Sequence, residues 1–324
     1  MNQPQVSVVI PTFNRSQIVR GAIDSVLAQT APGVETIVVD DGSTDDTVEQ
    51  LSRYGDAIRV IRRDNNGVSA ARNTGIRAAR GRWVAFLDSD DRWQPRKLER
   101  QLSCLEKLDA GVCFTRCIGD DGELIHDTDN LAVVRGENGY FHLANPLDLL
   151  GRKGWHPALP TMVVEKRLLE ENGLFDESLV AAEDTQLIYK LAFVSRFAYV
   201  DEPLVTVART PSDGLTCNYD PELAKQRLDS YIRVQAEAYF RLLDVDPKKA
   251  LAPRKVMGYF MSRRAEMACG AGEFAIARAF AMDGIFFSRY VRSLLTCLAI
   301  YIWPALFRNR FHKKWFVEPM KIVR

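Results

Sequence analysis

The run Trp83-Val84-Ala85-Phe86-Leu87-Asp88-Ser89-Asp90-Asp91 decides the fold, because an apolar stretch leads directly into three carboxylates. A short apolar run bounded by turn-forming residues predicts a buried strand of a parallel sheet. Such sheets bind ligands at the carboxyl ends of their strands, so these aspartates are expected at the rim of a crevice. A hard divalent cation, Mg²⁺ or Mn²⁺, would offset the repulsion between them. A solvated acidic turn that caps the next helix is an equal alternative.

Strands and helices alternate on the N-terminal side of this run. Apolar, β-branched stretches predict strands over 6–10, 35–39 and 58–61, the first ended by Pro11. Apolar residues at helical spacing predict helices over 16–29, 44–54 and 68–79, the first capped by Ser16. This alternation predicts βαβ units, and therefore an α/β fold with a mostly parallel central sheet flanked by helices.

The pattern loosens after Asp91. We expect a helix over 95–108, a strand over 111–118, a hairpin turn at 119–122, and mainly loop over 123–160. A strand over 161–164, a helical turn over 166–171, a helix over 184–193 and strands over 197–200 and 204–208 follow. From Pro221 onward the chain is expected to be an all-helical C-terminal extension.

Composition narrows the class of protein. The chain has 324 residues, of which 47% are hydrophobic, enough for one large domain or two modest ones. The formal net charge is +1 and there is no aromatic-basic repeat, so no nucleic-acid partner is expected. The six cysteines lack paired zinc-ligand spacing and are expected to be free thiols in a reducing cytoplasm. No signal peptide is expected at the N-terminus.

Polar or turn-forming residues follow the predicted strands, at 11–15, 40–43, 64–67 and 88–91. A nucleotide requires carboxylates for its base or ribose, cations for its phosphates, and backbone amides at close range. All of these are present. A dinucleotide or P-loop site is not expected, since no G-x-G-x-x-G or Walker A loop follows the first strand.

Six motifs carry a resemblance to a known family. They are Pro11-Thr-Phe-Asn-Arg, Asp40-Asp-Gly-Ser-Thr-Asp, Asn66-Gly67 with Ala71-Arg72-Asn73, Phe86-Leu-Asp-Ser-Asp-Asp, Phe175-Asp176-Glu177 and Glu183-Asp184. In this order they resemble the family 2 glycosyltransferases with the GT-A fold. Each motif alone is weak, but the ordered set is specific to the family, though not to a substrate.

The resemblance implies roles for the donor residues. Asp41, with Asp40 beside it, matches the carboxylate that bonds the nucleotide base, and a capping role before Thr44 is the alternative. Arg72 matches the arginine that contacts base or phosphates, and a solvated helix face is its alternative. Asp88 matches the ribose-facing aspartate, and Asp90 the ligand of Mn²⁺ or Mg²⁺, with Asp88 beside it. The full predicted nucleotide-sugar set is Pro11, Thr12, Asn14, Arg15, Asp40, Asp41, Asn66, Arg72, Asp88, Ser89 and Arg209.

The second acidic pair, Glu183-Asp184, supplies the expected catalytic base. The position of Asp184 matches the family residue that deprotonates the acceptor hydroxyl, and Glu183 is expected to support it. The positive end of the following helix would favour ionised Asp184. A pair of helix-capping acids is the alternative. Asp91 is expected to cap the helix that follows it.

Later residues bear on the acceptor. Arg209, followed by Ser212 and Thr216, resembles the family's late loop, and a surface loop is an equally good interpretation. His142, Trp155 and His156 lie where the family builds its acceptor pocket, and Trp155 could stack on a sugar or be a buried aromatic. The chain lacks the Q-x-x-R-W element of processive members, which predicts a non-processive enzyme.

The C-terminal third carries the least family information. Residues 294–307 are apolar but shorter than the roughly twenty residues of a spanning helix. Flanking cations within 289–314 fit either an interfacial helix on anionic lipid or a helix packed on the catalytic domain. We expect a catalytic domain over 1–216, with a nucleotide-sugar half (1–91) and an acceptor half (92–216), and a helical region over 217–324.

The expected function is therefore inverting transfer of a sugar from a nucleotide-sugar, with UDP the favoured nucleotide, to a hydroxyl of a glycan or lipid-linked acceptor. The expected place is the cytoplasm, at the inner face of the cytoplasmic membrane, in cell-surface polysaccharide or lipopolysaccharide synthesis. A nucleotidyltransferase and a non-catalytic sugar-nucleotide or glycan-binding module are the alternatives.

Overall fold

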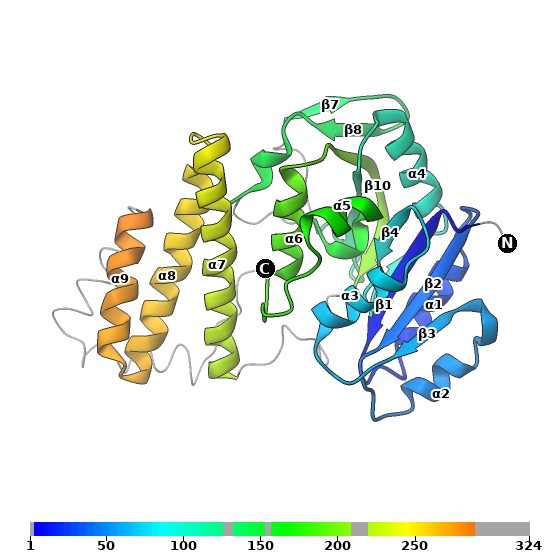
Figure 1. The fold of residues 1–324 in the computed structure, drawn as a ribbon, viewed down its shortest axis with the longest axis horizontal. Coiled ribbons are helices and arrows are strands. Elements are labelled where there is room, and N and C mark those ends of the chain that lie inside the picture. The colour runs from blue at the N-terminus through cyan, green and yellow to red at the C-terminus, as the bar shows by residue number, and fades with distance from the viewer. Residues whose placement is uncertain (1–2, 126–131, 153–156, 209–219, 289–324) are drawn as a thin grey trace. The chain divides into compact units, whose positions relative to one another are not determined.

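The computed structural model describes residues 3–125, 132–152, 157–208 and 220–288 (Figure 1). The chain divides into two compact units. The first, here called the sheet unit, comprises Met1–Pro146, Trp155–Glu177 and Gln186–Pro211. The second, the helical unit, comprises Leu147–Gly154, Ser178–Thr185 and Ser212–Arg324. The predicted domain boundary at 216 lies outside the described residues, and the division at 91 stays a prediction.

The sheet unit is built on a sheet with the strand order β3-β2-β1-β4-β9-β6-β10-β8-β7, with β5 paired to β10 (Figure 1). The strands β3 (Arg59–Arg62), β2 (Val34–Asp40), β1 (Val6–Thr12) and β4 (Trp83–Phe86) pair in parallel. Antiparallel β9 (Val163–Glu165) joins β4 to β6 (Val112–Gly119), which is parallel to β10 (Phe197–Val207). The remaining pairings, made by β5 (Arg92–Trp93), β7 (Val133–Arg135) and β8 (Tyr140–Leu143), are antiparallel. The predicted α/β fold is confirmed.

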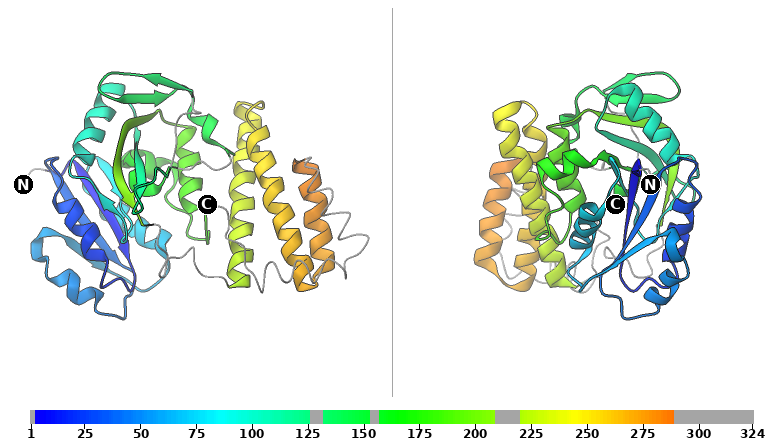
Figure 2. Two further views of the ribbon diagram at one scale, coloured as in Figure 1. Left: turned by 180° about the vertical axis from the view of Figure 1, so that it is seen from behind. Right: turned by 45° about the vertical axis from the view of Figure 1, so that its right-hand side comes forward.

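Helices cover both faces of the parallel strands (Figures 1 and 2). The helices α1 (Val19–Leu27), α2 (Thr47–Ser52) and α4 (Lys97–Leu108) share a core with Val8 and Ile10. On the other face α3 (Val68–Ala78) packs on Val9, which points away from Val8 and Ile10 because successive strand residues alternate. A Cβ at Gly75 of α3 would lie 2.3 Å from Cγ1 of Val9, so only a glycine at this position lets the helix pack so closely on Val9.

Three predicted ends in the first two βα units are wrong. The first strand continues through Pro11 to Thr12, because β4 pairs with β1 only as far as Val9 and requires no donor at Pro11. Ser16 does not cap α1; its amide donates to Asp45, and α1 begins at Val19. The second helix begins at Thr47 rather than Thr44, after the short segment in which Asp45 accepts from the Thr47 amide at 3.0 Å.

The prediction of loop over 123–160 is wrong for its described part. That part contains β7, β8 and the 3-10 turns Pro146–Leu149 and Leu159–Thr161. The hairpin is held by ring stacking of Phe141 on Tyr199 of β10, with centroids 5.0 Å apart. In addition, the two late strands form one strand, β10, whose register against β6 shifts around Pro203. The short helices η1 (Gly55–Ala57) and α5 (Lys166–Asn172) complete this unit.

The helical unit contains α7 (Pro221–Val245), α8 (Leu251–Ala271) and α9 (Phe274–Ser288). Asp220 caps α7, accepting from the amides of Glu222 at 2.7 Å and Leu223 at 3.1 Å. The helix α6 (Glu183–Ala192) has its first turn in this unit. No helix of the described residues combines the length and apolarity that crossing a membrane requires. The predicted interfacial stretch, 289–314, lies outside the described residues.

Candidate active site

The loops that follow β1 and β2 are tied to each other by hydrogen bonds. The Asp41 amide donates to the Thr12 carbonyl at 2.9 Å. The Asn14 amide donates to Oγ of Ser43 at 2.9 Å, and Oδ1 of Asn14 accepts from the Thr44 amide at 2.8 Å. Asn14 adopts φ 50°, a left-handed conformation that asparagine tolerates better than most residues. The first two motifs that were predicted to bind the nucleotide-sugar, at 11–15 and 40–43, are therefore held together by hydrogen bonds.

Asp40 and Asp41 are buried and serve different contacts. Asp40 accepts from the Ser43 amide at 3.1 Å, and its Oδ2 lies 3.4 Å from Nε of Arg62. Asp40 thus closes its own turn, while Arg62 offsets its charge. A carboxylate with no exposed surface, such as that of Asp40, supports the loop from beneath and offers a ligand little contact.

Asp41 holds the turn that precedes α3. Its two oxygens accept from the backbone amides of Asn66 at 3.3 Å and Gly67 at 2.8 Å. Nε of Arg63 lies 3.2 Å from Oδ1 of Asp41. Gly67 has φ 89°, which favours glycine at this position. Asp41 therefore orders the Asn66 loop, and the alternative that it caps α2 is wrong, since that helix begins at Thr47.

Arg72 and Asp88 form an ion pair at the end of β4. Nη2 of Arg72 lies 2.7 Å from Oδ1 of Asp88, and the guanidinium carbon lies 5.3 Å from the centroid of the Phe175 ring. Phe175 in turn meets Phe86 edge to face at 5.4 Å. Arg72 is buried, so the alternative that it lies on a solvated helix face is wrong.

The Asn73 side chain joins two motifs that are far apart in the sequence. Its Nδ2 donates to the Phe175 carbonyl at 3.0 Å and to Oε1 of Glu177 at 2.7 Å. Its Oδ1 accepts from the Phe175 amide at 3.0 Å. The Phe-Asp-Glu motif is therefore fixed to α3 beside Arg72.

The acidic run after β4 is crowded. Burial raises the pKa of Asp91 to about 8, with the carboxylate of Asp88 and then that of Asp90 adding to the effect. The prediction that Asp91 caps the following helix is wrong, because its Oδ1 accepts from the Ala208 amide at 2.9 Å and α4 begins only at Lys97. Asp91 thus holds the end of β10, the strand that leads to Arg209.

Within the described residues, no group of three or more His, Cys, Asp and Glu side chains is arranged to hold a metal ion. Asp88 pairs with Arg72, and Asp90, like Asp88, is partly exposed. The crowding of negative charge nevertheless fits a cation, which would offset the repulsion that raises the pKa of Asp91. A cation here would therefore need further oxygen ligands from a bound molecule.

Glu183 and Asp184 lie in the first turn of α6 and are half-buried. Oδ1 of Asp184 accepts from the Thr185 amide at 2.6 Å. A carboxylate at this end of a helix is favoured in its ionised form. The pair belongs to the helical unit, whereas Asp41, Arg72 and Asp88 belong to the sheet unit.

Some predicted residues can be placed only in part. Pro11, Thr12 and Ser89 are buried, while Asn14 is exposed and Arg15 intermediate. The Arg15 amide donates to Oγ1 of Thr47 at 2.9 Å. His142 lies in β8, with Nδ1 at 3.1 Å from the Leu143 carbonyl. Arg209, Trp155 and His156 lie outside the described residues.

Two contributors were missed. Arg63 pairs with Asp41. The register of β2 and β3 places Asp40 opposite Arg62, so the residues that follow them, Asp41 and Arg63, lie within reach of each other. Tyr231 of α7 is the other. Burial raises its pKa to about 12, and the nearby carboxylates of Asp184 and Glu183 add to this, whereas Arg227 opposes it. No local pattern connects α7 with residues almost fifty positions earlier.

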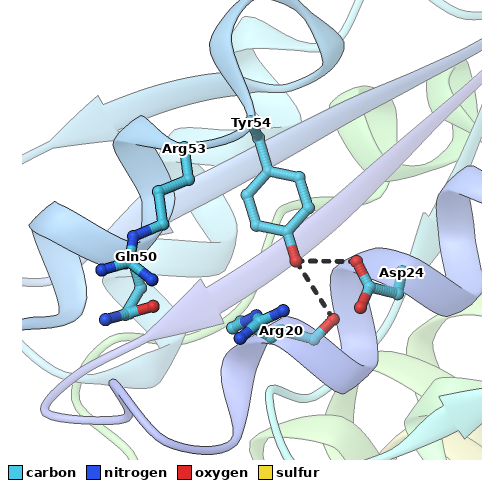
Figure 3. A pocket seen from close by; sticks show the side chains of 5 residues that line it. All are labelled: Arg20, Asp24, Gln50, Arg53 and Tyr54. Carbon is cyan, nitrogen blue, oxygen red and sulfur yellow. Dashed lines mark hydrogen bonds between the residues drawn. The ribbon is translucent and has the colours of Figure 1, made fainter.

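A small polar cavity lies away from these loops, between α1 and α2 (Figure 3). It has a volume of about 190 Å³ and is lined by Arg20, Asp24, Gln50, Arg53 and Tyr54. The Tyr54 hydroxyl donates to Oδ1 of Asp24 at 2.7 Å across it. None of the predicted site residues lines this cavity, so we do not assign the nucleotide to it.

Comparison with known proteins agrees with the geometry. Residues 7–159 match the family model described as Glycosyl transferase family 2. The chain therefore carries a family 2 glycosyltransferase domain, which confirms the family that the motifs predicted.

Individual relatives extend the comparison. The uncharacterized glycosyltransferase RP339 of Rickettsia prowazekii is 35% identical over 205 residues, covering 62% of this chain and 63% of that protein. The succinoglycan biosynthesis protein ExoO of Rhizobium meliloti is 33% identical over 190 residues, covering 57% and 55%. The matches thus span less than two thirds of these relatives. The structure of S. aureus TarS 1-349 in complex with UDP-GlcNAc superimposes with a TM-score of 0.64 at 19% identity, covering 95% of this chain and 92% of that one. This superposition shows that the two proteins share a fold.

Proposed function

We propose that the protein is an inverting, non-processive glycosyltransferase that moves a sugar from a nucleotide-sugar to a hydroxyl of a glycan or lipid-linked acceptor. The single observation that carries the proposal is the network joining four strand-end motifs in one unit, from Asn14–Ser43 through Asp41–Gly67 to Arg72–Asp88. This is the edge of a parallel sheet where nucleotides bind.

UDP is the proposed nucleotide and a surface polysaccharide the proposed product. The family domain and the fold shared with a UDP-GlcNAc complex of TarS support the donor class. The relative named as a succinoglycan biosynthesis protein supports a role in cell-surface polysaccharide or lipopolysaccharide synthesis. We place the reaction in the cytoplasm at the inner face of the membrane, with 289–314 as the proposed membrane contact.

Asp184 is the proposed base. Its carboxylate takes the proton of the acceptor hydroxyl while the acceptor oxygen forms its bond to the anomeric carbon. The bond from that carbon to the diphosphate oxygen breaks, and its electron pair leaves with the nucleoside diphosphate. One displacement requires one base and inverts the anomeric centre, and Glu183 supports the base from the preceding position.

On the donor side, Asp90 with Asp88 would hold Mn²⁺ or Mg²⁺. When bound, the cation would supply positive charge to the diphosphate of the leaving group. Arg72 is the protein's own cation at this place, and Asp88 holds it at 2.7 Å. The half-exposed Asp88 is the proposed ribose contact, and the Asn66 loop ordered by Asp41 the proposed base contact.

The test is release of nucleoside diphosphate from UDP-, GDP- and dTDP-sugars with glycan and lipid extracts, with and without Mn²⁺. We expect turnover with one donor, at least a hundredfold loss for Asp184→Asn, and a comparable loss for Asp90→Ala. Full transfer by both variants would refute the mechanism. Pyrophosphate as the product would instead identify a nucleotidyltransferase, and donor binding without turnover would identify a binding module.

A further inference from the structure

The loop that precedes the proposed base, residues 178–182, is attached to helix α7. Two hydrogen bonds connect residues 178–182 with this helix. The Val180 amide donates to Oγ of Ser230 at 3.2 Å, and Nη1 of Arg233 donates to Oγ of Ser178 at 2.8 Å. Both partners on α7 are one helical turn apart, so they lie on the same face.

The Ser230 hydroxyl is oriented by its own helix to accept the hydrogen bond from Val180. Ser230 is buried, and its hydroxyl donates to the Gln226 carbonyl at 3.0 Å while it accepts from Val180. Both functions of the hydroxyl are therefore used, and its orientation is set by the helix. A bond of this kind holds the loop at a defined place along α7.

The backbone at Ala182 is strained. Its φ is 62°, a left-handed conformation that is unfavourable for alanine, and it directly precedes Glu183. Such a conformation persists only where surrounding contacts over-determine it. The bonds from Ser230 and Arg233 lie on the N-terminal side of Ala182, and α6 begins on its C-terminal side. The contacts that hold the turn at Ala182 therefore also orient the Glu183–Asp184 pair that follows it.

Arg227 and Tyr231 also lie on α7, one turn apart from each other. The Tyr231 ring stacks on Phe260 of α8, with centroids 4.7 Å apart and planes 11° apart, which restricts its movement. The carboxylates of Asp184 and Glu183 add to the rise that burial gives the pKa of Tyr231. Arg227 is buried and lowers the pKa of Tyr231, against this rise.

We propose that α7 is the positioning element of the proposed base, with Ser230 and Arg233 holding the loop that precedes it and Tyr231, next to Ser230 and stacked on Phe260, supporting them. The inference rests on the proposed function, since it takes Asp184 as the base. It assigns to the helical region a part in acceptor activation, although the family model ends at residue 159.

Amide hydrogen exchange of the full-length protein tests the loop attachment without any substrate. Ser230→Ala is expected to speed exchange at the Val180 amide at least fivefold, because that amide loses its acceptor. The matched control is Ser52→Ala, which removes a hydroxyl that also bonds a carbonyl of its own helix but no distant amide. Equal exchange at Val180 in both variants would overturn the proposal whether or not Asp184 is a base.

Kinetics with the donor found in the panel above test the positioning. Tyr231→Phe is expected to lower kcat about tenfold while the donor KM and the affinity for UDP stay unchanged. Tyr239→Phe, the same change two turns further along α7, should leave kcat unchanged. Melting temperatures of the variants separate a change in kcat from loss of folding. Ser230→Ala is a second variant in which the same kinetic constants are measured. Equal kcat for both tyrosine variants would overturn the positioning role, whereas full activity of Asp184→Asn would overturn the proposed function instead.

Discussion

Nη2 of Arg72 donates a 2.7 Å hydrogen bond to Oδ1 of Asp88. Two residues that were predicted to bind the nucleotide-sugar therefore hold each other in place. The arginine side chain is 6% exposed and the aspartate 33%, which makes Asp88 the member of the pair that a ligand can reach. The Phe175 ring supports the guanidinium. The pair therefore orients a carboxylate at the end of β4.

Arg72→Lys should weaken UDP binding about tenfold, because an ammonium cannot reproduce the planar fork of a guanidinium over an aromatic ring. Isothermal calorimetry measures the affinity. Arg77→Lys on the same helix is the control, since its pairing with Glu177 is 4.0 Å long and exposed. If both variants bind UDP equally, the role proposed for Arg72 is wrong.

Asn73→Ala should lower the free energy of unfolding by about 2–4 kcal/mol, because three hydrogen bonds to the Phe175–Glu177 segment are lost, two of them buried. Denaturation in urea gives the value. Asn172→Ala removes a single bond, to the Leu168 carbonyl, and should cost no more than about 1 kcal/mol. A loss of less than about 1 kcal/mol for Asn73→Ala would contradict this account.

Lys97→Met should leave stability at pH 7 unchanged or raise it by roughly 1–2 kcal/mol. Lys97 is fully buried, with Nζ 3.8 Å from the centroid of the Trp93 ring, and burial holds its pKa well below the usual value. The folded state therefore binds fewer protons than the unfolded one, and wild-type stability rises with pH up to the ordinary lysine pKa of about 10.4. The methionine variant should lose this rise; retention of the full slope would show that another group causes it.

Asp91→Asn should flatten the pH dependence of stability between about pH 4 and pH 8 in metal-free protein. With the pKa of Asp91 raised to about 8, the folded state keeps a proton that the unfolded state releases near pH 4. Stability therefore falls as pH rises through this window, by at most about 1.4 kcal/mol per unit. Melting curves from pH 4 to 9 measure the slope. Asparagine retains an acceptor for the Ala208 amide, so an unchanged slope would exclude Asp91 as its source.

The sheet and most helices of the N-terminal half could be predicted from the sequence, because apolar periodicity there is uninterrupted. The extent of β4 and α3 follows directly from such patterns. The network around Asp41 was also within reach, since parallel strands bring their carboxyl ends together. Its individual partners were not, because Gly67 and Asn66 contribute backbone amides, which leave no mark on side-chain patterns.

Elements that depend on distant contacts could not be predicted. The β7–β8 hairpin pairs with β10 more than fifty residues later, a contact that no local pattern indicates. Its turn at Asn138-Gly139, with φ 60° and 72°, is a hairpin signal that the sequence analysis missed. Likewise, Asp91 follows β4 as a capping residue would, but its partner is Ala208. The link between Ser230 and Val180 joins segments fifty residues apart, and no motif indicated it.

Asp41 contacts the main chain of its neighbouring loop, so the side chains at 65 and 66 contribute nothing to that anchorage. Those two positions can therefore be randomised in a library while Gly67 and Asp41 are kept. Selection from such a library on GDP- or dTDP-sugars would be a direct route to enzymes with an altered choice of nucleotide.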